Sequence, residues 1–158
     1  MDLQAFLGRY GTDETNNFQL LHWAKQLRIP NFQVLMKDEI KQIDNTKPII
    51  NLITNIQVSD EPGAHWSGFH KGPEGNMFGK RFRHYWYDSY GRPPDEEVIQ
   101  QFGRGTILAS DDQNQEFGTT YCGQLALYFL YCMNKGIPFV KIVSELKNAD
   151  RHCLSVRQ

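Results

Sequence analysis

The sequence predicts a single domain, residues 1–158, that mixes helices and strands. Three segments carry this prediction: an apolar helix over 122–134, an aromatic β-hairpin over 65–90 and a β-branched strand over 49–58. The length of 158 residues fits one domain, because domains commonly run to roughly 100–200 residues. A chain of this size buries about 70% of its unfolded surface, so its core needs no metal or disulfide for support.

The N-terminal part is predicted from apolar spacing. Residues 13–28 are predicted to form a helix, with Thr12 or Asp13 as N-cap and Pro30 just beyond its end. The residues of its apolar stripe are Phe18, Leu20, Leu21, Ala24 and Leu27. Residues 31–36 form a short apolar stretch, and residues 49–58 are predicted to form a strand.

The hairpin is predicted from two aromatic or apolar segments, 65–70 and 81–90, on either side of a glycine-rich loop at 71–80. With the loop centred near Asn76 and Met77, the numbers of paired residues sum to about 153, with an error of about two. This register sets His65 opposite Asp88. Opposed side chains lie about 4.5–5.5 Å apart at Cβ, within reach of a hydrogen bond between imidazole and carboxylate.

The C-terminal half is predicted to contain two helices and a strand. Pro94 to Glu97 opens a short helix that closes at Gly103, and residues 106–109 form a strand before a polar loop at 110–118. Residues 122–134 form a helix that is apolar on nearly all sides, which is typical of a buried central helix. Thr119 or Thr120 is the expected N-cap.

Charge and composition exclude several classes of protein. Lys and Arg number 17 against 18 Asp and Glu, so the net charge of −1 argues against a dedicated nucleic-acid binder. No apolar run approaches the ~20 residues of a membrane span, and the N-terminus lacks the basic region of a secretory signal. The three cysteines form no Cys-x-x-Cys pair, so free thiols are expected.

Cys122 is the candidate nucleophile. It stands in the first turn of the apolar helix, where the helix dipole and unpaired N–H groups favour a thiolate. His65 is the candidate base, and Asp88 would orient and stabilise it. A glutamine in the 113–115 region, Gln113 or Gln115, would donate a hydrogen bond to the oxyanion.

Each of these residues also has a simpler interpretation: an inert buried thiol, a structural histidine, a turn aspartate or a solvated glutamine. The combination favours catalysis, because the hairpin brings His65 to Asp88 while Cys122 heads the apolar helix. A metal site of His65, His70, His84 and Asp88 is disfavoured, because His65 and His70 should point to opposite faces of one strand. We expect no metal and no cofactor.

These residues resemble the adenain family of viral maturation proteases and its relatives in virophages and Polinton-type elements. The resemblance covers about residues 30–135, and the ubiquitin-like-protein proteases share the general pattern. Its motifs are Gly63-Ala64-His65-Trp66, then Tyr85-Trp86-Tyr87-Asp88-Ser89-Tyr90-Gly91, then Gln115 seven positions ahead of Cys122-Gly123.

The resemblance implies an α+β cysteine endopeptidase of the papain-like superfamily, in circularly permuted order, with a mixed or antiparallel sheet packed on the helix that carries the nucleophile. It implies His65, Asp88, Gln115 and Cys122 as catalytic residues, and so favours Gln115 over Gln113. The expected substrates are viral capsid or core precursors, cut after small residues such as Gly during virion maturation. The expected protein is a monomer found in the virion and in the host cytoplasm or viral factory.

The sequence departs from the adenovirus members, which are strongly basic and use DNA and a disulfide-linked peptide as cofactors. A net charge of −1 does not support activation by DNA. No cysteine can be matched to the peptide-binding one: Cys132 is expected to be buried, and Cys153 lies in a polar tail. Two alternatives remain: a deconjugating protease for ubiquitin or a ubiquitin-like modifier, and a non-catalytic interaction module. The second is disfavoured because all four expected catalytic residues are present.

Overall fold

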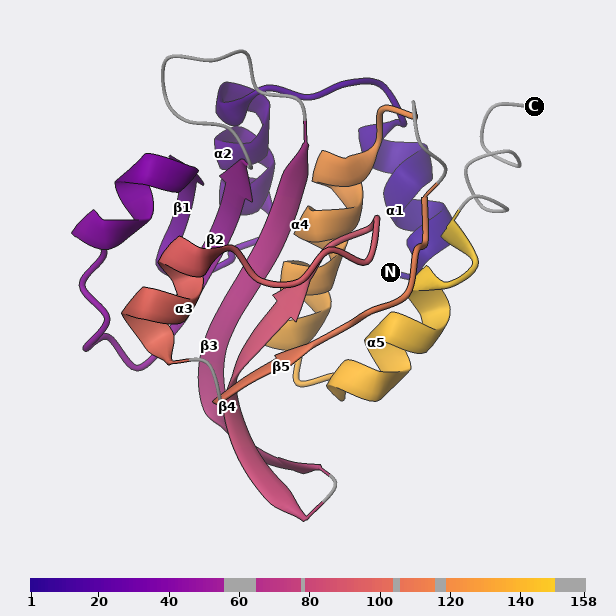
Figure 1. Cartoon of the computed structure of the whole chain (residues 1–158). Helices are drawn as coiled ribbons and strands as arrows, with labels where there is room; N and C mark the ends of the chain where they lie inside the picture. The colour runs from indigo at the N-terminus through magenta and orange to yellow at the C-terminus, as the bar shows by residue number, and fades with distance from the viewer. Residues whose placement is uncertain (56–64, 78, 104–105, 116–118, 150–158) are drawn as a thin grey trace.

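The computed structural model describes residues 1–55, 65–77, 79–103, 106–115 and 119–149. Its centre is a five-stranded mixed sheet in the order β1-β2-β3-β4-β5 (Figure 1). The two outer pairs are parallel and the two inner pairs antiparallel. The strands are β1 (Phe32–Met36), β2 (Ile50–Asn55), β3 (Trp66–Met77), β4 (Lys80–Tyr87) and β5 (Ile107–Ala109).

Helices cover both faces of the sheet (Figure 1). One hydrophobic cluster joins the sheet to α1 (Leu3–Tyr10), α2 (Asn17–Gln26), α4 (Cys122–Asn134) and α5 (Phe139–Leu146). A second cluster joins the other face to the 3-10 helix η1 (Lys37–Gln42) and to α3 (Glu96–Phe102). None of the described helices is long and apolar enough to cross a membrane.

Helix α4 has the bounds that the sequence predicts and is the buried central helix. It approaches β3 closely, because a Cβ on Gly68 would lie 2.9 Å from the Phe129 ring. The predicted threonine cap is wrong. The N-cap is Tyr121, which makes no side-chain capping bond, and the Thr120 hydroxyl instead donates to the Thr12 carbonyl at 2.7 Å.

The N-terminal region differs from the single predicted helix over 13–28. Two helices, α1 and α2, flank a segment at 12–16, and α1 was not predicted. Asn16 caps α2 through a reciprocal capping box with Gln19. The predicted stripe is only partly buried: Leu20 and Ala24 are in the core, while Phe18 is 75% exposed.

The hairpin is longer than predicted, and its register is shifted by two residues. Glycine-rich residues 71–77, predicted as loop, continue β3 through a bulge. Gly68 pairs with Tyr87, and Lys71 pairs with His84. Because successive side chains alternate between faces, a shift of two leaves every residue on its predicted face.

The remaining predictions fall on shorter elements. Helix α3 ends at Gly103 as predicted, and the φ of 92° at Gly103 is a conformation that glycine readily adopts. Strands β2 and β5 lie within their predicted segments. Helix α5 was not predicted. Residues 56–58 of the predicted strand, Gly63, Ala64, Gly118 and Cys153 lie outside the described residues.

Candidate active site

The candidate site lies where three elements meet at one end of the sheet (Figure 1). His65 immediately precedes β3, Asp88 immediately follows β4, and Cys122 is the first residue of α4. All three side chains are buried: His65 is 3% exposed, Asp88 0% and Cys122 6%. The fold thus brings together three residues that are far apart in sequence.

Asp88 is bonded to His65 as the sequence predicts, although the register is not the predicted one. The His65 Nε2 donates to the Asp88 carboxylate at 2.9 Å. Continuing the observed register places Ser67 opposite Asp88, and the Ser67 hydroxyl donates to the same oxygen at 2.5 Å. His65 reaches the carboxylate from the next position on the same face, and its ring stacks on Tyr90 at 4.3 Å between centroids.

The charges of the pair support one another. Burial by itself lowers the pKa of His65, but the bond to Asp88 and the neighbouring Cys122 outweigh it and raise that pKa to about 9. Burial raises the pKa of Asp88, yet the bonds from His65, Ser67 and the Tyr90 backbone bring it below its usual value. At neutral pH the pair is therefore an imidazolium and a carboxylate.

The two ring nitrogens of His65 have different surroundings. Nε2 is held by Asp88, whereas Nδ1 is buried and has no hydrogen-bond partner among the described residues. The Cys122 side chain nevertheless interacts with the ring and raises the pKa of His65. Nδ1 is thus the nitrogen left to exchange a proton with a thiol or with a leaving group.

Gln115 joins the site through Ser89, the residue after Asp88. The Ser89 hydroxyl donates to Gln115 Oε1 at 2.6 Å, and the Gln115 side chain is buried. The Gln115 Nε2 is a buried donor without a partner in the described part of the chain. Gln113 has a different place, because its side chain donates to the Gln115 carbonyl at 3.0 Å.

The N-terminal segment 12–16 lies across the start of α4. The side chains of Trp66 and Gln124 donate to the carbonyls of Thr15 and Asp13, at 3.2 and 2.8 Å. A Cβ at Gly123 would lie 2.3 Å from the Thr15 hydroxyl oxygen. Glycine after Cys122 is therefore required by this close packing with the Thr15 side chain.

Sequence reasoning missed the residues that support the site. Ser67, Ser89 and Tyr90 each contact a predicted catalytic residue, and Arg92 donates to the Asp88 carboxylate at 3.2 Å. The buried side-chain amide of Asn114 has no hydrogen-bond partner among the described residues. The sequence signal for Ser67 was its place two residues after His65, on the same face of the strand.

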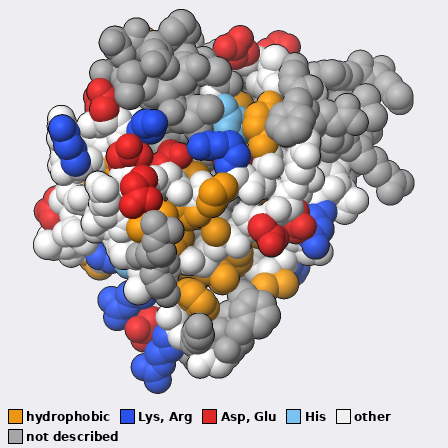
Figure 2. Space-filling view, viewed as in Figure 1, with side chains coloured by type: hydrophobic (Ala, Val, Ile, Leu, Met, Phe, Trp, Pro, Cys, Tyr) orange, Lys and Arg blue, Asp and Glu red, His pale blue; other side chains and the backbone are white. Residues whose placement is uncertain are grey.

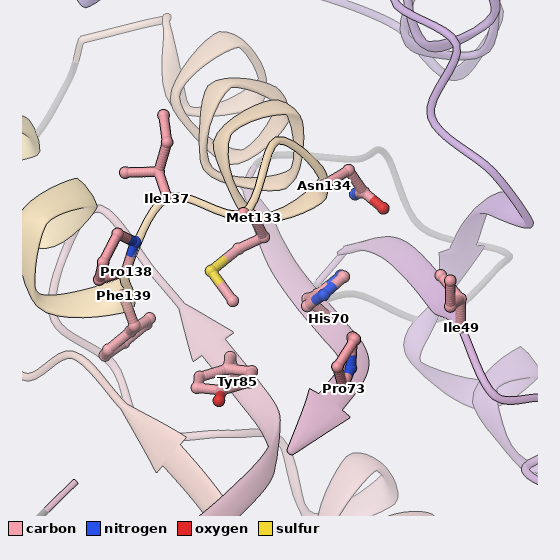
Figure 3. Close-up of a pocket in the computed structure, with 10 residues that line it drawn as sticks. Ile49, His70, Pro73, Tyr85, Met133, Asn134, Ile137, Pro138 and Phe139 are labelled. Carbon is pink, nitrogen blue, oxygen red and sulfur yellow. The ribbon is translucent and has the colours of Figure 1, made fainter. Parts of the chain in front are cut away.

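His70 and His84 lie away from this site. His70 lines a pocket of about 370 Å³ at the other end of α4, with Met133, Pro138 and Phe139 (Figure 3). Its Nδ1 bonds to Asn51 at 2.7 Å, whereas the His84 Nδ1 contacts the Thr106 hydroxyl. Within the described ranges no three His, Cys, Asp or Glu side chains are placed to hold a metal ion.

Acidic side chains lie among Lys and Arg side chains on the face shown in Figure 2, in the region of η1 and α3. The first turns of these helices carry Asp38, Glu39, Glu96 and Glu97.

Comparison with known proteins places the fold. No protein-family model matches the chain, and no curated protein matches it. The crystal structure of the ASFV pS273R protease is similar, with a TM-score of 0.63 and 17% identity over 89% of this chain and 67% of that chain. A selenomethionine structure of the same protease gives 0.58 and 16%, over 89% and 68%. The predicted α+β class with a mixed sheet is confirmed, and this chain shares its fold with the ASFV pS273R protease.

Proposed function

We propose that this chain is an adenain-type cysteine endopeptidase that cleaves viral capsid or core precursors during virion maturation, after small residues such as Gly. One observation carries the proposal: a buried His65, bonded to Asp88 and next to Cys122, with a pKa of about 9. An imidazolium between a carboxylate and a thiol at a helix N-terminus is the arrangement of a thiol nucleophile with its acid-base partner. The fold shared with a viral protease supports the viral role.

The reaction follows from these groups. The Cys122 thiolate attacks the scissile carbonyl, and the resulting oxyanion accepts hydrogen bonds from the Gln115 Nε2 and the Cys122 backbone N–H. His65 gives its proton to the leaving amine, which departs and leaves a thioester. Water then attacks the thioester while His65 takes its proton, and the acid product leaves as the thiol or thiolate is restored.

The test is digestion of a proteome-derived peptide library, with identification of the new N-termini by mass spectrometry. The wild type should cut after small residues, and Cys122→Ala should fold normally and cut nothing. Iodoacetamide should label Cys122 and abolish cleavage in step. Cleavage by Cys122→Ala would contradict the assignment of the nucleophile.

Two further substrates separate the substrate classes. Co-expression with candidate capsid precursors should give Cys122-dependent processing of those precursors. If the protein instead cleaves only after the C-terminus of a ubiquitin-like modifier in a fusion protein, and leaves library peptides and precursors intact, a deconjugating protease is favoured.

A further inference from the structure

We propose that Ser89 is the positioning residue that orients the Gln115 carboxamide toward the oxyanion, an inference that rests on the proposed function. The Ser89 hydroxyl donates to Gln115 Oε1 at 2.6 Å, and both side chains are 1% exposed. The Ser89 carbonyl accepts from the backbone N–H groups of Asn114 and Gln115, at 2.6 and 3.1 Å. Ser89 thus holds both the backbone and the side chain of Gln115.

The orientation of a carboxamide is a real choice. The terminal torsion of a glutamine is broad and roughly two-fold, so its oxygen and its NH₂ group can exchange places at little cost. A hydroxyl that donates to Oε1 selects one of these orientations. The NH₂ group is then left buried and without a partner among the described residues, as a donor reserved for a ligand atom requires. The reversed amide would present an oxygen to the oxyanion and repel it.

The turn that carries Ser89 is itself held in place. The Gly91 N–H donates to the Asp88 carbonyl at 2.9 Å. Gly91 has a φ of 76°, and a Cβ there would lie 2.9 Å from the Asp111 carbonyl oxygen. The turn is therefore packed against the segment that leads to Gln115. Consecutive residues have separate tasks: Asp88 holds the imidazole, and Ser89 holds the oxyanion donor.

This division predicts a split between two measurements on Ser89→Ala. Using a fluorogenic peptide chosen from the library cleavages, kcat should fall about 10–100-fold with KM nearly unchanged, because removing an oxyanion donor outright costs about 10²–10³-fold. Alkylation of Cys122 by iodoacetamide forms no oxyanion, so its rate and pH profile should stay as in the wild type. Ser89→Cys, which keeps a weak donor, should have an intermediate kcat.

A double-mutant cycle tests whether Ser89 acts through Gln115. Ser89→Ala should lower kcat in the wild type and add nothing in a Gln115→Ala background. The matched control is Ser110→Ala, because the Ser110 hydroxyl is also buried but has no partner among the described residues. This control should keep full kcat.

The outcomes separate the two proposals. A wild type that cleaves, with full kcat in Ser89→Ala or with losses that simply add to those of Gln115→Ala, overturns the role of Ser89 alone. A slowed alkylation of Cys122 in Ser89→Ala also overturns it, because the effect would then lie on the thiol. A wild type that neither cleaves nor reacts at Cys122 overturns the proposed function and the role of Ser89 with it.

Discussion

Two buried histidines at opposite ends of α4 differ in charge although they are equally hidden from water. His65 and His70 belong to the same stretch of chain, and each is 3% exposed. The pKa of His65 is raised to about 9, whereas burial lowers the pKa of His70 to about 4. At neutral pH one ring is a cation and the other is neutral.

The difference lies in the partners. His65 meets a carboxylate and a thiol, whose charges stabilise the protonated ring. His70 meets the Asn51 amide oxygen, which also accepts from Asn134 at 2.8 Å, and a neutral amide does not repay the desolvation of a cation. A histidine on a buried strand face is therefore not a site by itself. The group placed beside it decides whether it can hold and release a proton at a useful pH.

The largest effect is expected from exchanging each histidine for glutamine. His65→Gln should lose about 10²–10⁴-fold in kcat, because a carboxamide cannot carry the proton to the leaving amine. His70→Gln should keep its activity, since glutamine can still donate to Asn51. Steady-state kinetics on one peptide, with circular dichroism to verify folding, makes the comparison. Equal losses in both variants would mean that His65 has only a structural role.

Removing the negative charge beside His65 should lower the pKa of its ring toward that of His70. In Asp88→Asn the amide still orients the imidazole but no longer stabilises its charge, so the pKa of His65 should fall. The alkaline limb of the kcat/KM profile, expected near pH 9 in the wild type, should move to lower pH. The rate should fall less than in His65→Gln. An unchanged alkaline limb would show that another acid sets the ring's charge.

The two histidines should change the free energy of unfolding in opposite directions as the pH rises. The pKa of His70 is depressed in the folded state, so unfolded chains bind the extra proton between about pH 6.5 and pH 4, and stability falls as the pH drops through that window. Its effect on the free energy of unfolding is at most about 4 kcal/mol, because the pKa shift from 6.5 to about 4 spans two to three tenfold changes in proton affinity of ~1.4 kcal/mol each. The pKa of His65 is raised, so its contribution is full below about pH 6.5 and is lost as the pH rises through about 9.

Urea unfolding of His70→Gln and the wild type at pH 7.5 and pH 5 measures the acid slope. The variant should lose less stability on acidification than the wild type does. If the two proteins differ in the free energy of unfolding by the same amount at both pH values, the depressed pKa of His70 is contradicted.

The smallest effect is expected at the ring that covers His65. Tyr90 stacks on the imidazole with 12° between the planes, and a cation over an aromatic face gains about 0.5–2 kcal/mol. Tyr90→Leu should therefore move the alkaline limb to lower pH by less than Asp88→Asn does, by roughly 0.5–1 on the pH scale. The same pH profile measures it, and a displacement toward higher pH would contradict a stabilising stack.

The sequence by itself determined the parts of the site that follow from local periodicity and parity. The bounds of α4 follow from apolar residues that continue until Asn134, and the end of α3 follows from Gly103. The bond between His65 and Asp88 was predicted in spite of a register error of two, because such an error leaves both residues on the same face of the hairpin.

Only the tertiary structure decided what depends on contacts between distant segments. Local patterning began the predicted helix at residue 13, but residues 12–16 are not helical. Side chains of Trp66, Thr120 and Gln124 bind the backbone carbonyls of that segment. Nothing within a window of one or two helical turns reveals such a bond. The orientation of Gln115 likewise depends on a hydroxyl 26 residues earlier in the chain. These features come from side-chain groups meeting backbone or amide groups across the fold, and only the assembled fold sets those distances.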